Sequence, residues 1–160
     1  MSTHTTIETD PDHYPTMSAS GARLKSIRPV AALTFFEQFA APIQRVPRRM
    51  VAWGAFEDGI TLIGAVALAR VSEATFWAQV AVAPERRRLG IGAELLDVAI
   101  REASAGGGRR LSGSYPSCAL EPRALVEAQP LSIARQVRRG QAEVVLFIPE
   151  AKARTTGGQT

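Results

Sequence analysis

The chain has 160 residues, a length that suits one domain with its own hydrophobic core. Its residues are 46% hydrophobic and the mean hydropathy is near zero, which is typical of a globular protein, and no apolar run is long enough for a transmembrane helix. The formal net charge is +4, but the arginines occur as scattered pairs that do not alternate with aromatic residues. A nucleic-acid-binding surface usually gathers its basic residues on one face or interleaves them with aromatic residues, so this distribution argues against one.

The two ends of the chain differ in composition from the middle. Residues 1–20 and 151–160 are polar and show no apolar period, so we expect disordered tails on either side of a single domain at 21–150. The first segment has neither a basic nor an apolar region of the kind that a secretory signal needs. His4 and His13 fall in this tail, and no cluster has metal-ligand spacing, so no metal site is expected. Cys118 is the single cysteine, which excludes an intramolecular disulfide and favours a cytoplasmic location.

Strand-like and helix-like segments alternate along the middle of the chain. Period-two patterns, with turn signals at Asp58-Gly59 and Arg139-Gly140, predict strands over 23–28, 50–56, 60–69, 74–82, 110–114, 131–137 and 142–148. Helical periodicity predicts helices over 30–40, 90–104 and 119–128, with a further short or distorted helix between Pro42 and Pro47. The clearest is 90–104, which we expect to bury Leu95 and Val98 and to end at the glycines that follow it.

The run from Val82 to Leu96, VAPERRRLGIGAELL, joins a strand end, three arginines and a Gly-x-Gly that opens a helix. Arginine supplies fork-shaped donors, glycine lets the backbone come close to a ligand, and the first helical turn offers unsatisfied N–H groups. These three features together predict a pyrophosphate site. A dinucleotide fingerprint would need a third glycine, and a Walker loop would need Gly-Lys-Ser/Thr; both are absent. A solvated basic face is the plain alternative.

Within this run, Arg87-Arg88-Leu89-Gly90-Ile91-Gly92 fits the signature Arg/Gln-x-x-Gly-x-Gly/Ala. The segment resembles the acyl-CoA loop of the GNAT acyltransferase superfamily, and the order of strands and helices from 23 to 148 is similar to that of the family as well. The resemblance implies an α/β (α+β) fold with a mixed, mostly antiparallel sheet of six or seven strands and about four helices. It also implies transfer of an acyl group, with acetyl-CoA as the expected co-substrate, to an amine.

In that family the strand before the loop parts from the next strand, and the acyl thioester lies in the gap. The backbone of Val80 and Val82 would then pair with the pantetheine, as an added strand does. The loop amides, with the side chains of Arg86 and Arg88, would hold the pyrophosphate. Alternating valines are equally typical of an ordinary core strand. The cofactor-binding residues that the resemblance implies are Val80, Ala81, Val82, Arg86, Arg87, Arg88, Leu89, Gly90, Ile91, Gly92 and Ala93.

The family's usual proton donor to the leaving thiolate, a tyrosine, falls on Val126 in this sequence. Nearby substitutes are Tyr115, Ser117 and Cys118, each with a structural alternative: a packed strand end, a helix cap and a small buried residue. We take Tyr115 and Cys118 forward as catalytic candidates.

The sequence also differs from the family's usual pattern at the position of the general base. Ala78 and Gln79 stand where many relatives have a carboxylate midway along the strand. The nearest acids are Glu73, at the start of that strand, and Glu57-Asp58 in a hairpin turn. Glu73 is therefore the third catalytic candidate, beside transfer through an ordered water.

Two functions remain open at this point. The first is an acyl-CoA N-acyltransferase that acts by direct attack of a primary amine, of a small molecule or a protein, on the thioester. The second is a catalytically weak GNAT-like module that binds acyl-CoA or a partner; the missing tyrosine favours it, while intact Gly90 and Gly92 favour the enzyme. Nucleic-acid binding comes third and predicts steep salt dependence. Homodimers are common in the family, with the terminal hairpin as a candidate interface, and the sequence does not indicate the acceptor.

Overall fold

The computed structural model describes residues 21–40, 47 and 49–150. The two expected tails, 1–20 and 151–160, and most of the segment between Pro42 and Pro47 lie outside the described residues. The elements in chain order are β1 (Arg23–Ile27), α1 (Pro29–Phe39), β2 (Met50–Glu57), β3 (Thr61–Arg70), β4 (Thr75–Val82), the 3-10 helix η1 (Pro84–Arg86), α2 (Ile91–Ala105), β5 (Arg110–Pro116), α3 (Leu120–Glu127), β6 (Ser132–Arg138) and β7 (Gln141–Phe147).

The seven strands of the described residues join one sheet in the order β1-β2-β3-β4-β5-β7-β6. Every neighbouring pair is antiparallel except β4 and β5, which run parallel. The mixed, mostly antiparallel sheet expected from the sequence is therefore confirmed. The expected helix number was slightly high: the described residues form three α-helices rather than about four, and the segment expected to hold another helix is mostly outside them.

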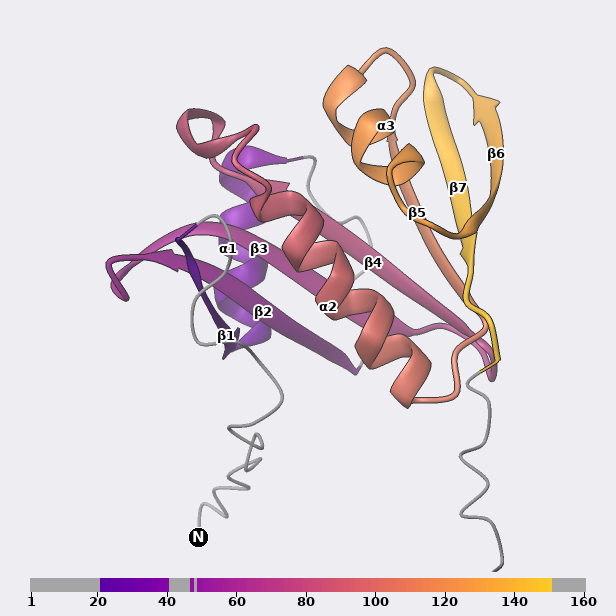
Figure 1. Ribbon diagram of the computed structural model, residues 1–160, viewed down its shortest axis with the longest axis horizontal. Helices are drawn as coiled ribbons and strands as arrows, with labels where there is room; N and C mark the ends of the chain where they lie inside the picture. The colour runs from indigo at the N-terminus through magenta and orange to yellow at the C-terminus, as the bar shows by residue number, and fades with distance from the viewer. Residues whose placement is uncertain (1–20, 41–46, 48, 151–160) are drawn as a thin grey trace, which may run out of the picture.

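Helices cover both faces of the sheet (Figure 1). On one face α2 buries Leu95 and Val98 completely against β2, β3 and β4, as its periodicity predicts. On the other face α1 packs its buried Phe36 beside Ala65 and Ala67 of β3. The small alanines of β3 leave room for the aromatic side chains of α1, so the two faces of a single strand serve two cores.

Strands β4 and β5 pair only over a short stretch. Their register runs from Thr75↔Arg110 to Trp77↔Ser112 and then ends, and Figure 1 shows the two strands splayed apart beyond that point. At the last contact a Cβ on Gly113 would stand 3.2 Å from the carbonyl oxygen of Ala78, so glycine permits the close approach just before the strands part. The splay leaves one edge of β4 unpaired next to the loop that follows it.

The closed end of this splay is fixed by the C-terminus of α2. A Cβ on Gly108 would lie 2.7 Å from both the carbonyl oxygen of Ala103 and the ring of Phe76, so only glycine fits there. The guanidinium of Arg70 stacks over the same ring, 4.7 Å from its centroid, and donates to the carbonyls of Glu73 and Gly106. These contacts hold the end of α2 and the start of β4 together.

Candidate functional site

The loop between β4 and α2 has a backbone shaped for an anion. Arg88 and Gly90, two positions apart just before the helix begins, have φ values of 65° and 85°, in the left-handed region. The six backbone amides from Arg88 to Ala93 donate no hydrogen bond to any residue that the structure describes. A Cβ on Gly90 would meet no atom within 4 Å, so the loop is open on that side. Consecutive unpaired N–H groups at a helix N-terminus are the backbone arrangement that binds phosphates.

The three arginines of the loop have different partners. Arg86 donates from Nε and Nη2 to the two carboxylate oxygens of Glu57, at 2.9 and 2.8 Å. Arg87 donates from Nε to the carbonyl oxygen of Val82 at 3.1 Å. Arg88 is the most exposed of the three side chains, at 85%. The hydrogen bonds and charge of Glu57 raise the pKa of Arg86, so this cation is held by the protein itself.

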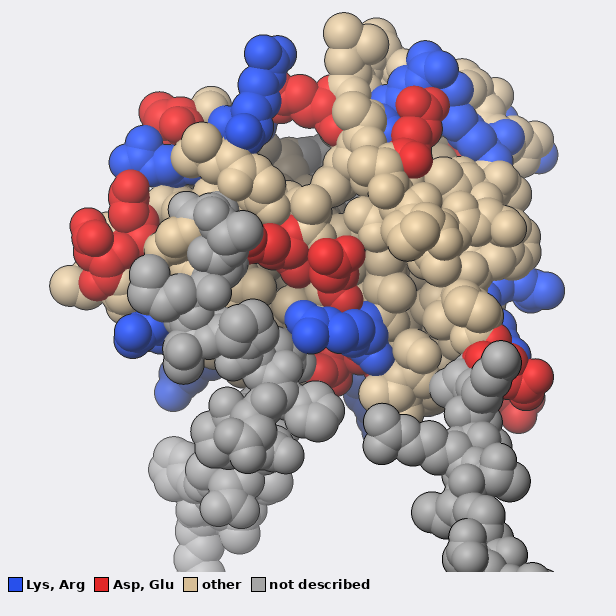
Figure 2. Space-filling view, in the orientation of Figure 1, with Lys and Arg blue, Asp and Glu red and all other residues tan. Residues whose placement is uncertain are grey.

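Glu121, in the first turn of α3, faces the other two arginines. Its carboxylate oxygens lie 3.8 Å from Nε of Arg87 and 3.5 Å from Nε of Arg88. One turn further along α3, Leu125 approaches Gly92, where a Cβ would stand 3.5 Å from a Leu125 methyl group. Helix α3 therefore bridges from the separated strand β5 back to the loop, and Figure 2 shows the surface hollowed between the loop and α3.

The free edge of β4 presents peptide groups to this hollow. The amide of Ala83 bonds to the carbonyl of Ile63 in β3, and strand alternation then turns the peptide groups of Val82, Val80 and Ala78 away from β3. The carbonyl oxygen of Phe76, two residues earlier still, accepts from the hydroxyl of Ser112 in β5, which confirms the direction. An extended amide-bearing ligand could pair with this edge as an extra strand does.

The arrangement fits acyl-CoA on two counts. The six open amides suit a diphosphate, and the unpaired edge of β4 suits the amides of a pantetheine arm. The expected residues Val80, Ala81 and Val82 lie on that strand, and the loop continues from it through Arg86, Arg87, Arg88, Leu89 and Gly90 to the first turn of α2 with Ile91, Gly92 and Ala93. The structure thus brings all the expected cofactor-binding residues to one edge, although the Arg86 side chain is directed to Glu57.

The three catalytic candidates fall in different places. Tyr115 is on β5 and is buried at 7% exposure in the core beneath α2; extending the register beyond Trp77↔Ser112 sets it opposite Val80 across the splay. Cys118 is exposed, in the turn that follows β5, where Ser117 bonds to Gly140 of the β6–β7 turn. Of the three, only Tyr115 lies on a strand that lines the gap.

Glu73 lies away from the gap. It precedes β4, at the closed end of the splay, where its carbonyl accepts from Arg70. Val80 is seven positions further along the chain, which corresponds to about 23 Å along an extended strand. This position gives no support to Glu73 as a general base at the gap.

A row of polar side chains crosses the sheet at the level of the gap, and the sequence reasoning missed it. Ser114 pairs with Glu143, which pairs with Gln136, and extension of the β4–β5 register sets Gln79 beside Ser114. Directly paired residues share a face of the sheet. Ser114 and Glu143 are exposed, and no described residue forms an ion pair with the Glu143 carboxylate. The alternation along 141–147 was visible in the sequence, but the register that aligns the row was not.

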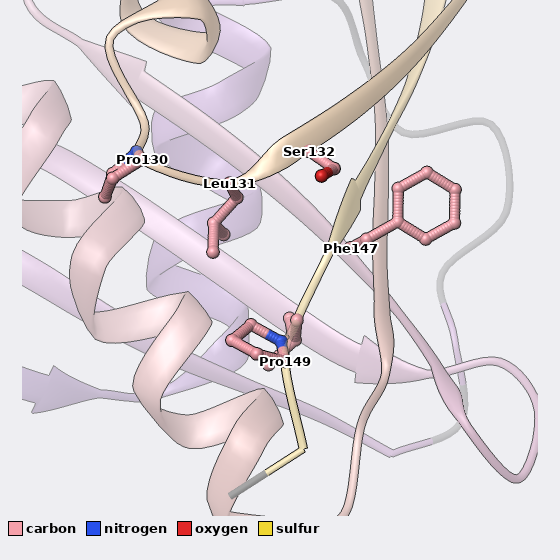
Figure 3. A pocket seen from close by; sticks show the side chains of 6 residues that line it. Pro130, Leu131, Ser132, Phe147 and Pro149 are labelled. Atoms are coloured by element: carbon pink, nitrogen blue, oxygen red, sulfur yellow. The ribbon is translucent and has the colours of Figure 1, made fainter.

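A separate open pocket of about 320 Å³ lies near the start of β6 and the end of β7. Its lining residues are Pro130, Leu131, Ser132, Phe147, Ile148 and Pro149. Figure 3 shows Leu131 and Phe147 pointing to different sides, and the one side-chain polar group in the lining is the hydroxyl of Ser132. This lining offers neither an acid nor a base, so we do not expect acyl transfer there.

No helix in the described ranges is long and apolar enough to cross a membrane.

The model of the acetyltransferase (GNAT) family matches residues 22–120, more than half of the chain. The chain therefore belongs to the GNAT acetyltransferase family. No curated protein matches the sequence.

Solved structures show the same fold at low identity. The GNAT domain of PAT from S. lividans is 16% identical with a TM-score of 0.63, covering 81% of this chain and 93% of that domain. The yncA protein from Salmonella typhimurium, solved with its cofactor acetyl-CoA, is 16% identical with a TM-score of 0.62, and the match covers 84% of this chain and 98% of that one. The ribosomal-protein-S18-alanine N-acetyltransferase from Escherichia coli is 20% identical with a TM-score of 0.61 and covers 83% and 97%.

Proposed function

We propose that this protein is an acyl-CoA-dependent N-acyltransferase, with acetyl-CoA as co-substrate and a primary amine of a small molecule or protein as acceptor. The observation that carries the proposal is the set of six open backbone amides from Arg88 to Ala93, continuous with the free edge of β4. Two structures with the same fold support it, since yncA was solved with acetyl-CoA and another neighbour is a ribosomal-protein-S18-alanine N-acetyltransferase.

When bound, acyl-CoA supplies an activated thioester, and the chain's own groups position it. The loop amides and the Arg87 and Arg88 side chains hold the diphosphate, while Val80 and Val82 orient the pantetheine arm along β4. An outward N–H near Val80 is placed to stabilise the thioester oxygen as negative charge develops there. The bond from nitrogen to the acyl carbon forms as the carbon–sulfur bond breaks, so no protein nucleophile is required.

Tyr115 is the group we assign to protonate the leaving thiolate, because it lies on β5 across the splay from Val80. Glu143 is our candidate for receiving the acceptor amine. It is exposed on the face of β7 opposite the α2 core, in the polar row that reaches the gap through Ser114. A carboxylate there attracts an ammonium and can take its proton, directly or through a water.

Calorimetric titration of acetyl-CoA and CoA tests the first half of the proposal. We expect micromolar binding that falls strongly in the Arg87→Ala, Arg88→Ala double variant and is unchanged in Arg23→Ala, an exposed arginine on the distant edge strand β1. A screen of amines, read out as free thiol released from acetyl-CoA, tests the second half. The exposed thiol of Cys118 reacts with the same reagent, so the screen uses Cys118→Ser.

The competing function is an acyl-CoA-binding module with little turnover. Val126 in the family's tyrosine position favours it. It predicts binding of acetyl-CoA with no thiol release for any amine, whereas absence of binding removes both proposals.

Two further parts of the proposal concern the location of the protein in the cell and its oligomeric state. We place the reaction in the cytoplasm, which the single cysteine supports. We also propose the β6–β7 hairpin as a homodimer interface, because β6 is an edge strand and exposes Val137 at 52%. Sedimentation of the full chain at several concentrations tests the second point; a monomer throughout contradicts it.

A further inference from the structure

Glu121, on α3, is the acidic residue of that helix that faces the proposed diphosphate loop between β4 and α2. It contacts Arg87 and Arg88 together, at 3.8 and 3.5 Å, through different carboxylate oxygens. The Arg86–Glu57 pair beside it has hydrogen-bond distances and two-point geometry, whereas the Glu121 contacts are longer than hydrogen bonds. Arg87 and Arg88 thus share the carboxylate of Glu121 through longer contacts than those between Arg86 and Glu57.

The loose geometry makes this contact easy to displace. The side chains of Arg87, Arg88 and Glu121 are 40%, 85% and 44% exposed, so water and salt screen their attraction. A diphosphate carries more negative charge than one carboxylate and can accept from the open loop amides as well as from the arginines. It would therefore replace Glu121 as the partner of both arginines.

The backbone of Glu121 cannot withdraw far when its side chain is displaced. Leu125, one turn later on the same side of α3, packs against Gly92, and the next residue, Val126, is buried in the core beneath α2. The displaced carboxylate consequently stays near the loop and repels the incoming diphosphate.

We propose that Glu121 is an intramolecular competitor for the diphosphate site and that it sets the protein's affinity for CoA. This inference rests on the proposed function, because it takes the loop as the CoA site. It assigns Glu121 the opposite effect from a ligand-binding residue: removal of its charge strengthens binding. One unit charge about 5 Å from the diphosphate in a water-like medium corresponds to an affinity change of about three- to tenfold.

The test is calorimetric titration of CoA into the wild-type chain, Glu121→Gln and Glu127→Gln at low and high salt. Glu127 is a matched control: it lies on the same helix, about 9 Å along the axis from Glu121, and pairs with Arg123 at 2.8 Å. Both variants change the net charge equally, so a difference in CoA affinity between them does not come from net charge. We expect Glu121→Gln to bind CoA about three- to tenfold more tightly at low salt, with the gain shrinking at high salt, and Glu127→Gln to match the wild type.

Other outcomes overturn the inference in distinguishable ways. Equal affinities for Glu121→Gln and the wild type mean that the carboxylate does not compete. Weaker binding by Glu121→Gln means that it positions the arginines instead. Dephospho-CoA keeps the diphosphate, so loss of the gain with this ligand would place the repulsion at the 3′-phosphate. If the wild type and both variants all fail to bind CoA, the proposed function itself fails, and this inference with it.

Discussion

Arg86 and Glu57 form a two-point ion pair between η1 and the end of β2, with N···O distances of 2.9 and 2.8 Å. The two residues are 29 positions apart in sequence, and their pair ties the start of the loop to the β2–β3 hairpin. We propose that the pair gives Arg86 a positioning role; the expectation from the sequence is a direct contact with the diphosphate.

A double-mutant cycle on CoA affinity distinguishes these two roles. If the pair positions the loop, Arg86→Ala and Glu57→Ala weaken binding to a similar extent, and the double variant is no worse than either. If Arg86 contacts the diphosphate directly, Glu57→Ala leaves the arginine free, and affinity is kept or rises. The first pattern is the one we expect.

Arg88→Ala is expected to weaken CoA binding by about three- to tenfold, because its exposed guanidinium is screened but lies beside the open amides. The slope of affinity against salt concentration should fall as well. Arg23→Ala, on the opposite edge of the sheet, serves as control. Equal effects of the two substitutions would show that only net charge matters.

Tyr115→Phe is expected to lower kcat by about 10²-fold while CoA affinity stays unchanged, because only the hydroxyl is lost. The phenyl ring keeps the packing of a residue that is 7% exposed. Cys118→Ser should retain nearly full turnover, since direct attack needs no nucleophile and Cys118 lies in an exposed turn. Full activity in Tyr115→Phe with loss in Cys118→Ser would reverse this assignment.

Glu143→Gln is expected to lower kcat/KM for an amine acceptor about tenfold or more and to alter its pH profile, since both ammonium attraction and proton acceptance are lost. Glu37→Gln, an exposed acid on α1, makes the same change in net charge. An unchanged pH profile in Glu143→Gln with a raised KM alone would leave Glu143 as a binding group and exclude it as the base.

The sequence predicted the strands and helices of the described region closely, because each has a strong local signal. Strand ends differ by at most two residues from the expected ones, and the turn at Asp58-Gly59 and the glycine stop after Ala105 are where composition places them. The loop from Arg87 to Gly92 could also be predicted, since its arginines and its two glycines lie in one short run of the sequence.

Contacts between distant segments were not readable. Glu57 was expected in a hairpin turn and Glu121 was not singled out, because an ion pair across the fold leaves no periodic pattern in sequence. Glu73 precedes the start of β4, and only the structure shows that β4 and β5 part towards the other end of that strand.

Asp97, on the exposed side of α2, offers a pH-dependent test of stability. Partial burial raises its pKa and outweighs the opposing attraction of Arg101; Glu94 adds to the rise. For an acid with a raised folded-state pKa, the favourable contribution is full only below the unfolded pKa and is lost as pH rises through the folded one. Asp97→Asn should therefore have a higher Tm than wild type at pH 7, with the difference vanishing near pH 3. A lower Tm at pH 7 would mean that the attraction of Arg101 dominates.

Gly108→Ala is expected to reduce the free energy of unfolding by about 1–3 kcal/mol, as overpacking does. The added methyl would meet Phe76 and the Ala103 carbonyl, both at 2.7 Å. Gly107→Asn is the control, because that position has a φ of 82° with open space around it and asparagine tolerates the left-handed region. Thermal unfolding that shows equal losses would locate the cost in backbone conformation rather than in the contact with Phe76.

Residue-resolved amide hydrogen exchange, with and without saturating acetyl-CoA, tests whether the open amides from Arg88 to Ala93 bind the diphosphate. We expect exchange at these amides to slow markedly on addition of acetyl-CoA, together with exchange at the outward amides of Val80 and Val82. Saturable binding of acetyl-CoA that leaves these amides exchanging at their original rates would contradict this expectation.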